Sequence, residues 1–239
     1  MLGFVQAKRT LLFITGQQKK CLLYGLQRSG TNYVEKIVAK NIPEIRFVND
    51  RRDRSSPLNK HFRLYRDKAY IPTDQYRTED VVERYDQLID TVMRYNVTPD
   101  LVIVVIRHPF HWYRSYLSWA ELCGWDQSAY AYIREWNLFY GAWESLAREA
   151  PKEVLIFRYE DVLAGYRSGV PRLCERLGIE GRDSIDTYMS KVPVSGRMTE
   201  DKIASNLRPV ALSDFPKWKQ KLICEILDFD LVKRMGYSV

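Results

Sequence analysis

Two glycines bracket a short loop near the start of the chain, within the sequence LLYGLQRSGTNY at residues 22–33. Gly25 and Gly30 have the spacing of the glycines in the phosphate-binding loop G-x-x-x-x-G-K-[ST]. An apolar run precedes the loop, and a helical pattern follows it at residues 32–41. A loop between a strand and a helix start gathers backbone N–H groups around one point, which attracts anions. The stretch therefore predicts a cradle for a phosphate-like group.

The same loop lacks the residues with which ATP-binding loops hold a magnesium nucleotide. Thr31 stands where the lysine is expected, and Asn32 stands where the metal-binding hydroxyl is expected. The cation of this loop is Arg28, which lies inside it. A nucleotide or small-molecule kinase with a degenerate phosphate loop is an alternative interpretation, and the missing lysine argues against it.

A second anion site is predicted after the apolar run at residues 101–106. Arg107 follows this run directly, and Ser115 comes eight residues later in a helical pattern. Open α/β sheets bind ligands at the carboxyl ends of their strands, where Arg107 is expected to lie. A guanidinium and a hydroxyl converging there can hold a phosphate. Two anion sites on successive strand ends suit a nucleotide that is phosphorylated at two places.

These motifs together resemble those of the sulfotransferases that use 3′-phosphoadenosine-5′-phosphosulfate (PAPS), in the short bacterial and Golgi-like form. RSGTNY (residues 28–33) is similar to the family's 5′-phosphosulfate loop, and IRHPFHWYRSY (residues 106–116) is similar to its 3′-phosphate element. FRYEDVL (residues 157–163) and the final Gly-Tyr (residues 236–237) resemble further family elements. The resemblance implies a transferase with PAPS as donor and adenosine 3′,5′-bisphosphate (PAP) as product.

The resemblance also implies roles for individual residues. Arg28 would contact the sulfuryl group, and no metal would be needed, because fixed cations and N–H groups can stabilise a sulfuryl transition state. The residues implied to bind the donor are Arg28, Ser29, Gly30, Thr31, Asn32, Arg107, Ser115 and Arg197.

An attacking acceptor must lose a proton, and histidine is the side chain best suited to take it near neutral pH. We expect His61 to be this base, although it could also be an ordinary strand-end histidine. Lys60 directly precedes it and is a weaker, charge-stabilising candidate. Neighbours on a regular strand point to opposite faces, so only a bulge or an irregular turn lets both address one site. Golgi-type relatives use a carboxylate instead, which makes Asp50 the runner-up.

Other polar and aromatic residues of these segments have structural interpretations. Trp112 and Tyr116 belong to a stripe at helical spacing that is typical of a core. The pair Glu160 and Asp161 is expected to cap a helix and to order a neighbouring arginine. His108 precedes a proline and is expected to shape a turn.

Alternating strand and helix patterns predict how these motifs are held. Five strand-like runs are expected: Cys21–Leu26, Ile45–Asn49, His61–Tyr65, Leu101–Arg107 and Glu153–Tyr159. Six helical segments are expected: Asn32–Asn41, Glu79–Tyr95, Trp112–Glu121, Ala129–Glu149, Val162–Leu177 and Pro216–Met235. This order predicts the α/β class, as a three-layer P-loop-like fold with a central parallel sheet flanked by helices. We expect a single domain over residues 1–239, because no repeat or Gly/Ser linker interrupts the pattern.

The composition indicates a globular protein with acidic partners. Hydrophobic residues make up 46% of the chain, and 37 basic against 30 acidic residues give a net charge of +7. This balance favours nucleotides, sulfated or phosphorylated substrates, or nucleic acid as partners. A basic nucleic-acid-binding protein is therefore a further alternative, but it gives no reason for two phosphate motifs at strand ends. We expect no nucleic-acid partner.

The cysteine pattern indicates a reducing compartment. Four scattered cysteines form no C-x-x-C motif, so we expect neither a zinc site nor a disulfide framework. No apolar run approaches the roughly 18–20 residues of a membrane span. We therefore expect a cytoplasmic protein without stable membrane insertion.

The acceptor is expected to be a carbohydrate or small molecule that offers a hydroxyl or an amine. Residues 51–57, 66–76 and 118–132 are expected to choose it, and the charged first stretch (RRDRSSP) is a candidate lid.

Overall fold

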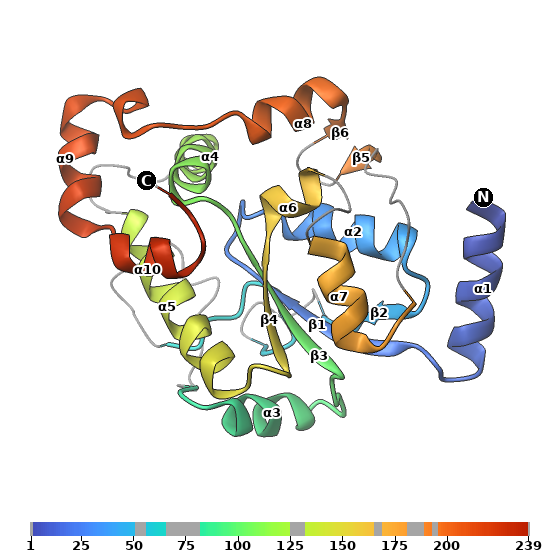
Figure 1. The fold of residues 1–239 in the computed structure, drawn as a ribbon. Helices are drawn as coiled ribbons and strands as arrows, with labels where there is room; N and C mark the ends of the chain where they lie inside the picture. The colour runs from blue at the N-terminus through green and yellow to red at the C-terminus, as the bar shows by residue number, and fades with distance from the viewer. Residues whose placement is uncertain are drawn as a thin grey trace.

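The computed structural model describes residues 2–50, 56–65, 82–124, 132–164, 169–180, 189–192 and 196–238 (Figure 1). In chain order the elements are α1 (Leu2–Ile14), β1 (Lys19–Tyr24), α2 (Thr31–Asn41), β2 (Ile45–Phe47), α3 (Tyr85–Met93), β3 (Leu101–Ile106), α4 (Pro109–Leu122), α5 (Ile133–Glu149), β4 (Val154–Arg158), α6 (Tyr159–Leu163), α7 (Gly169–Leu177), β5 (Met189–Val192), β6 (Gly196–Met198), α8 (Glu200–Leu207), the 3₁₀ turn η2 (Leu212–Asp214), α9 (Lys217–Ile226) and α10 (Phe229–Arg234).

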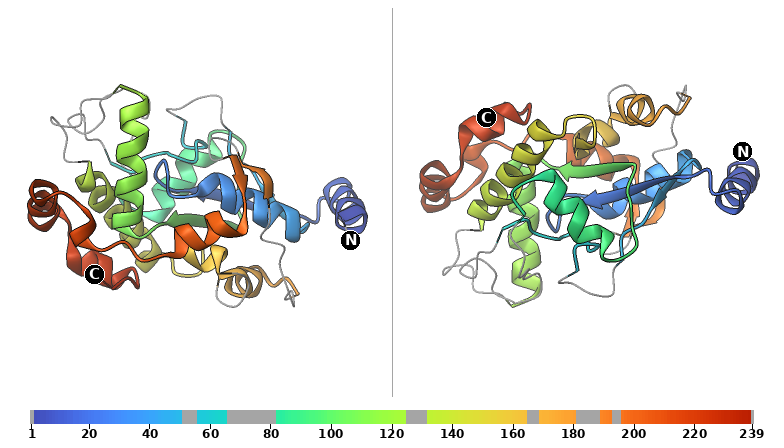
Figure 2. Two further views of the ribbon diagram at one scale, coloured as in Figure 1. Left: turned by 90° about the horizontal axis from the view of Figure 1, so that it is seen from above. Right: turned by 90° about the horizontal axis from the view of Figure 1, so that it is seen from below.

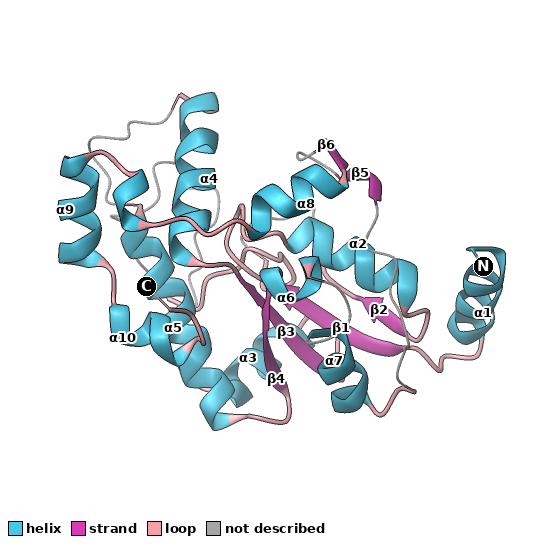
Figure 3. Cartoon of the chain, turned by 45° about the horizontal axis from the view of Figure 1, so that its top comes forward, coloured by secondary structure: helices cyan, strands magenta, loops and turns pink. Residues whose placement is uncertain are grey.

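A parallel sheet of four strands, in the order β2-β1-β3-β4, forms the centre of the molecule (Figure 3). The register pairs Cys21 with Leu101, and Val105 with Phe157. Because the strands are parallel and in this register, the segments that follow β1, β3 and β4 start at the same edge of the sheet. Both predicted anion motifs begin at that edge.

Helices cover both faces of this sheet (Figure 2). Side chains of β3 alternate between two separate core clusters, with Val102, Val104 and Ile106 in one and the residues between them in the other. The first cluster contains residues of α3, α4, α5, α9 and α10. The second contains residues of α2, α6 and α7. The predicted fold class, a central parallel sheet flanked by helices, is therefore confirmed.

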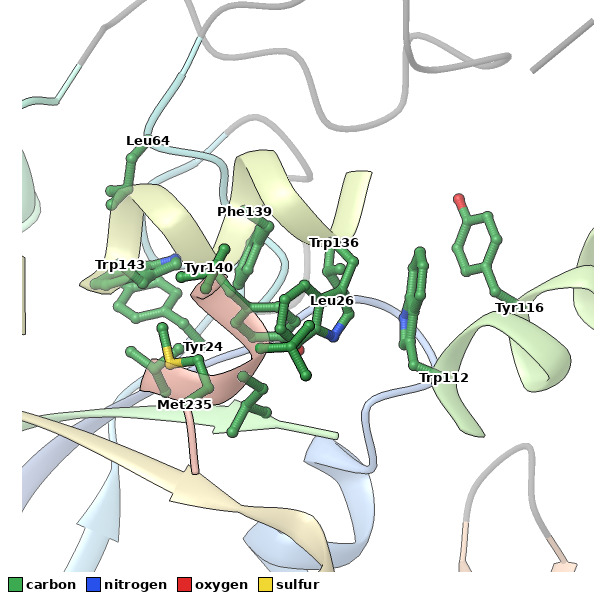
Figure 4. Packing of buried hydrophobic residues seen from close by; sticks show 14 of the residues in the cluster. Tyr24, Leu26, Leu64, Trp112, Tyr116, Trp136, Phe139, Tyr140, Trp143 and Met235 are labelled. Atoms are coloured by element: carbon green, nitrogen blue, oxygen red, sulfur yellow. The ribbon is translucent and has the colours of Figure 1, made fainter. Parts of the chain in front are cut away.

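Aromatic side chains dominate the first cluster (Figure 4). Tyr24 of β1 stacks on Trp143 of α5 with ring centroids 4.7 Å apart, and Trp112 stacks on Tyr116 within α4 at 4.9 Å. Trp112 is completely buried and Tyr116 nearly so, as the core interpretation of this stripe predicts. Large rings of this kind contribute much of the apolar area that stabilises the fold.

Several predicted element boundaries were wrong. The long C-terminal segment forms two helices, because Leu227 adopts an extended conformation and the Asp228 side chain accepts a bond from the Leu231 N–H at 2.8 Å. An acceptor in that position starts a new helix. The expected helix over residues 162–177 is likewise divided, into α6 and α7, and residues 165–168 lie outside the described part. The helices α1 and α8 and the antiparallel pair β5-β6 were not predicted at all.

The expected strand His61–Tyr65 is also absent from the described residues, where turns occupy residues 56–61. Asn49, just beyond β2, attaches these turns to the sheet. Its side-chain amide accepts from the Leu23 N–H at 2.8 Å and donates to the carbonyls of Leu23 at 3.0 Å and Leu58 at 3.1 Å. One amide thus extends the pairing of β1 and fixes the start of the next segment.

None of the helices within the described residues has both the length and the apolar character that a membrane crossing requires.

The first prediction concerns this amide. Asn49→Ala should lower the free energy of unfolding by about 1–3 kcal/mol, because the buried Leu23 N–H loses its acceptor. Guanidinium unfolding followed by tryptophan fluorescence measures the change. Asn41→Ala is the control, since its amide bonds to the Ile37 carbonyl of its own helix, and it should cost less than about 0.5 kcal/mol. Equal losses in the two variants would contradict the role given to Asn49.

Candidate functional site

Both glycines of the loop after β1 lie where a side chain cannot fit. A Cβ on Gly25 would lie 2.7 Å from the Ser29 hydroxyl and from the Val105 carbonyl oxygen. A Cβ on Gly30 would lie 2.2 Å from the Tyr159 ring, and its φ of +94° is itself a conformation that favours glycine. The loop is therefore folded back tightly on the strand ends.

The helix α2 begins directly after this loop. Gly30 occupies its N-cap position without a side-chain cap, and Ser29 and Thr31 are buried on either side. A helix start without a capping side chain presents its first N–H groups to an incoming acceptor. The backbone at residues 25–31 therefore has the loop and helix-start geometry that a phosphate cradle requires.

Turns at residues 56–61 place His61, the predicted base, and Lys60, the predicted charge-stabilising residue, against the loop. The Gly25 N–H donates to the Lys60 carbonyl at 2.9 Å, and the Gly25 carbonyl lies 2.6 Å from His61 Nδ1. Lys60 Nζ donates to the Asn32 side chain and lies 3.4 Å from a Glu35 carboxylate oxygen. A regular strand would have separated Lys60 from His61, and the turns bring both to one loop.

The contact with Gly25 fixes the tautomer of His61. A carbonyl oxygen can only accept, so the hydrogen bond at 2.6 Å requires the proton on Nδ1. In the neutral imidazole the lone pair then lies on Nε2, the nitrogen that can take a proton. The geometry is that of a general base oriented by its other nitrogen.

The two predicted anion motifs are in direct contact. Arg28, with a φ of +70°, donates from Nε to the Ser115 hydroxyl at 3.1 Å, and its guanidinium lies over the Trp119 ring at 5.5 Å. Arg107 donates from Nη1 to the Arg28 carbonyl at 3.1 Å. The sequence motifs assigned Arg28 and Ser115 to separate phosphates, and the structure brings them together with Arg107.

Arg107 is a buried cation whose hydrogen bonding is incomplete. It is 8% exposed, its Nη2 donates to the Asn206 side chain at 2.7 Å, and its guanidinium lies over the Tyr159 ring at 5.2 Å. Its Nε is buried and has no hydrogen-bond partner among the described residues. A buried guanidinium donor without an acceptor is costly, and a bound anion would supply one.

The electrostatics of the cluster also favour an anion. Burial lowers the pKa of Arg28, and the nearby Arg107 guanidinium lowers it further. Burial likewise lowers the pKa of Arg107. Within the described residues, neither guanidinium forms a salt bridge with a carboxylate. Two like charges held close together are stabilised when a negative group binds between or beside them.

Core aromatic side chains hold the backbone beneath both motifs. Trp112 donates from Nε1 to the Gln27 carbonyl at 2.8 Å, and Trp136 donates from Nε1 to the Arg107 carbonyl at 3.0 Å. These bonds fix the peptide on each side of the anion loops. The sequence indicated that Trp112 lies in the core, but it did not indicate that its indole N–H bonds to the loop backbone.

Two contributors to the cluster were missed from the sequence. Tyr159 lies against Gly30 and Arg107, and its place at the end of a predicted strand in FRYEDVL was the available signal. Nothing in the sequence indicated that Asn206 of α8 belongs to the site, because it lies 99 residues from Arg107 and none of the residues of α8 is buried.

Other predicted residues lie in several places. Asp50 is exposed, and its N–H donates to the Leu58 carbonyl at 3.0 Å. Arg197 lies in β6, just before α8, but its side chain is outside the described part. The candidate lid falls largely on residues 51–55, which also lie outside it, as do 66–76 and 125–131 of the expected acceptor segments.

The acidic pair after β4 has one of its two predicted roles: it orders a neighbouring arginine, but no described side chain caps α6. Glu160 accepts from the His108 N–H at 2.9 Å and from the Tyr237 hydroxyl at 2.8 Å. Asp161 accepts two bonds from Arg158, at 2.7 and 3.0 Å. Glu160 therefore secures the turn beside Arg107 and the C-terminal tail. His108 caps α4 by accepting from the Phe110 N–H, as expected of a turn-shaping residue.

No family model matches the chain, and no curated protein matches it significantly. Among solved structures it is similar to mouse sulfotransferase SULT7A1 complexed with PAP, at 17% identity and a TM-score of 0.44, over 92% of this chain and 89% of that chain. It is also similar to a sulfotransferase from Alicyclobacillus acidocaldarius, at 14% identity and a TM-score of 0.41, over 91% of this chain and 99% of that one.

Substitution of the second loop glycine tests the tightness of the cradle. Gly30→Ala should destabilise the protein by about 2–5 kcal/mol, because the methyl group overlaps the Tyr159 ring in addition to the backbone strain. Gly178→Ala is matched for positive φ (+62°) but has open space around it, so strain alone should cost about 1 kcal/mol. Thermal unfolding measures both. A Gly30→Ala loss no larger than that of Gly178→Ala would contradict the close packing described.

Proposed function

We propose that this protein transfers a sulfuryl group from PAPS to a hydroxyl or amine of a carbohydrate or small-molecule acceptor. The observation that carries the proposal is the Arg107 guanidinium, buried beside Arg28 with one donor unpartnered among the described residues. A site of this kind suits a multiply charged anion, and the residues around it match the family's motifs in order and spacing.

The residues present fit a donor with two anionic ends. Backbone N–H groups of the loop from Gly25 and the start of α2 would hold the 5′-phosphosulfate, beside Thr31 and Asn32. Arg107 and Ser115 would hold the 3′-phosphate, with Arg197 from the segment before α8. When bound, PAPS supplies an activated sulfuryl group with PAP as its leaving group.

The chain's own contribution to the chemistry is orientation and proton transfer. His61, with its proton fixed on Nδ1 by Gly25, would accept the acceptor's proton at Nε2 as the acceptor attacks. The cations Arg28 and Lys60 would stabilise negative charge that develops on the transferring group and on the leaving oxygen. Lys60 is 8% exposed, so its charge acts in a poorly hydrated environment.

A titration tests the donor assignment directly. PAP should quench or shift tryptophan fluorescence in the presence of EDTA, because Trp112 and Trp136 bond to the loops that would move on binding. Adenosine 5′-phosphate and ATP should bind far more weakly. Equal affinity for PAP and adenosine 5′-phosphate would overturn the proposal, as would ATP binding that depends on Mg²⁺.

Arg107→Ala should weaken PAP binding by about 10- to 150-fold, which corresponds to about 1.5–3 kcal/mol for a charge-assisted hydrogen bond. The same fluorescence titration measures it. Arg148→Ala, an exposed arginine near the end of α5, is the control and should leave PAP affinity unchanged. Identical affinities for the two variants would remove Arg107 from the site.

His61→Ala should reduce kcat by about 10²–10⁴-fold and leave PAP affinity nearly intact, because the base acts only on the acceptor's proton. Transfer of labelled sulfate from PAPS to a panel of sugars, phenols and amines gives the rate. Asp50→Asn is the comparison. If Asp50→Asn loses activity and His61→Ala keeps it, the carboxylate is the base.

A further inference from the structure

Arg63 and Glu135 form an ion pair deep in the protein. Arg63 Nε lies 2.5 Å from Glu135 Oε1, and the two side chains are 2% and 3% exposed. The Tyr65 hydroxyl donates to the same carboxylate oxygen at 3.0 Å. Burial disfavours the charge of Arg63, but the Glu135 carboxylate outweighs this and raises the pKa of the guanidinium above its ordinary value.

Stability alone does not account for a pair in this position. Removing two charges from water costs several kcal/mol per ion, and apolar side chains of similar size often stabilise a core as well or better. Their neighbours in the chain, Phe62, Leu64 and Trp136, belong to the first core cluster, where apolar side chains pack readily. The charges therefore require another reason.

The remaining N–H groups of Arg63 point to the proposed catalytic elements. Nη1 donates to the His61 carbonyl at 3.3 Å, and Nη2 lies 3.5 Å from the Gln27 side-chain oxygen. Gln27 is the residue before Arg28, and its own carbonyl accepts from Trp112. One rigid guanidinium thus links α5, the turns that carry His61 and the anion loop.

We propose that Arg63 and Glu135 are positioning residues that hold the His61 turn in register with the Gly25–Gly30 loop. Glu135, on helix α5, holds the Arg63 guanidinium in one orientation. In that orientation the guanidinium bonds to the His61 carbonyl and reaches the Gln27 side chain. The bond from His61 Nδ1 to Gly25 is the contact that this arrangement protects. The inference rests on the proposed function only in taking His61 as the base.

Two variants test the pair without leaving a lone buried charge. Arg63→Met with Glu135→Leu removes both charges at similar volume, and Arg63→Lys keeps the charge but cannot span His61 and Gln27 together. Both should remain folded and bind PAP within about threefold of the parent. Both should lower kcat by about 10- to 100-fold, the loss that a displacement of about 1 Å produces.

The matched control is Arg234→Met with Glu144→Leu, which removes an ion pair of 2.8 Å between α10 and the same helix α5. It should leave kcat unchanged. A kcat that falls equally in the control and in the Arg63 variants would overturn the proposal, because it would report general loosening of α5.

A cycle with His61→Ala separates positioning from simple destabilisation. If the pair acts through His61, adding Arg63→Met and Glu135→Leu to His61→Ala should change the residual rate by less than about twofold. If the rate loss of His61→Ala and the rate loss of the Arg63 and Glu135 substitutions multiplied in the combined variant, the inference would be overturned.

Nitrogen-15 NMR of labelled histidine gives a readout that does not need enzyme activity. The chain has only three histidines, and the hydrogen-bonded Nδ1 proton of His61 is assigned by its loss in His61→Ala. In the Arg63 variants the His61 Nδ1 proton signal should lose intensity or shift toward that of an imidazole N–H that exchanges with water. The signals of His108 and His111 should not change. An unchanged His61 signal refutes the positioning role. If sulfuryl transfer fails but the signal moves, the proposed function is wrong and the positioning contact stands.

Discussion

The geometry of the site depends on the peptide of one residue, Gly25. Its N–H donates to the Lys60 carbonyl and its carbonyl accepts from His61 Nδ1, so both backbone groups are committed to the turns at residues 56–61. Its α-carbon is packed so closely against Ser29, Thr31 and Val105 that no side chain fits. The anion loop and the base candidate therefore cannot move independently, because they share this peptide.

A cluster of buried cations has to be held by something other than carboxylates if it is to bind an anion. Here the guanidiniums are fixed by neutral groups: the Arg28 carbonyl and the Asn206 amide for Arg107, and the Ser115 hydroxyl for Arg28. Neutral acceptors orient the cations without cancelling their charge. The Trp112 and Trp136 indole N–H groups likewise hold the backbone beneath the loops.

Local patterns were sufficient to predict the four strands of the parallel sheet and the tight glycine loop after β1, because each depends on residues close in sequence. They failed at His61–Tyr65, which was predicted to be a strand but follows the turns at residues 56–61. The side chains of Ser56 and Asn59 accept from the Leu58 and His61 N–H groups, at 3.1 and 2.9 Å, so local bonds replace a strand ladder. The buried pair of Arg63 with Glu135 joins residues 72 apart, and no periodicity could have indicated it.

The contact between Arg28 and Ser115 has a consequence for how the two anion motifs act. Each motif supplies a single arginine, so either motif alone offers an anion fewer charged donors than the two together. In this fold the Arg28 carbonyl receives Arg107 while the Arg28 side chain reaches Ser115, so one residue belongs to both motifs. Under the proposed function, an anion that drew Arg28 toward the glycine loop would release the Ser115 hydroxyl for a second anion. The shared residue makes a ligand charged at both ends a better fit than two separate anions, because one molecule satisfies both motifs at a single entropic cost.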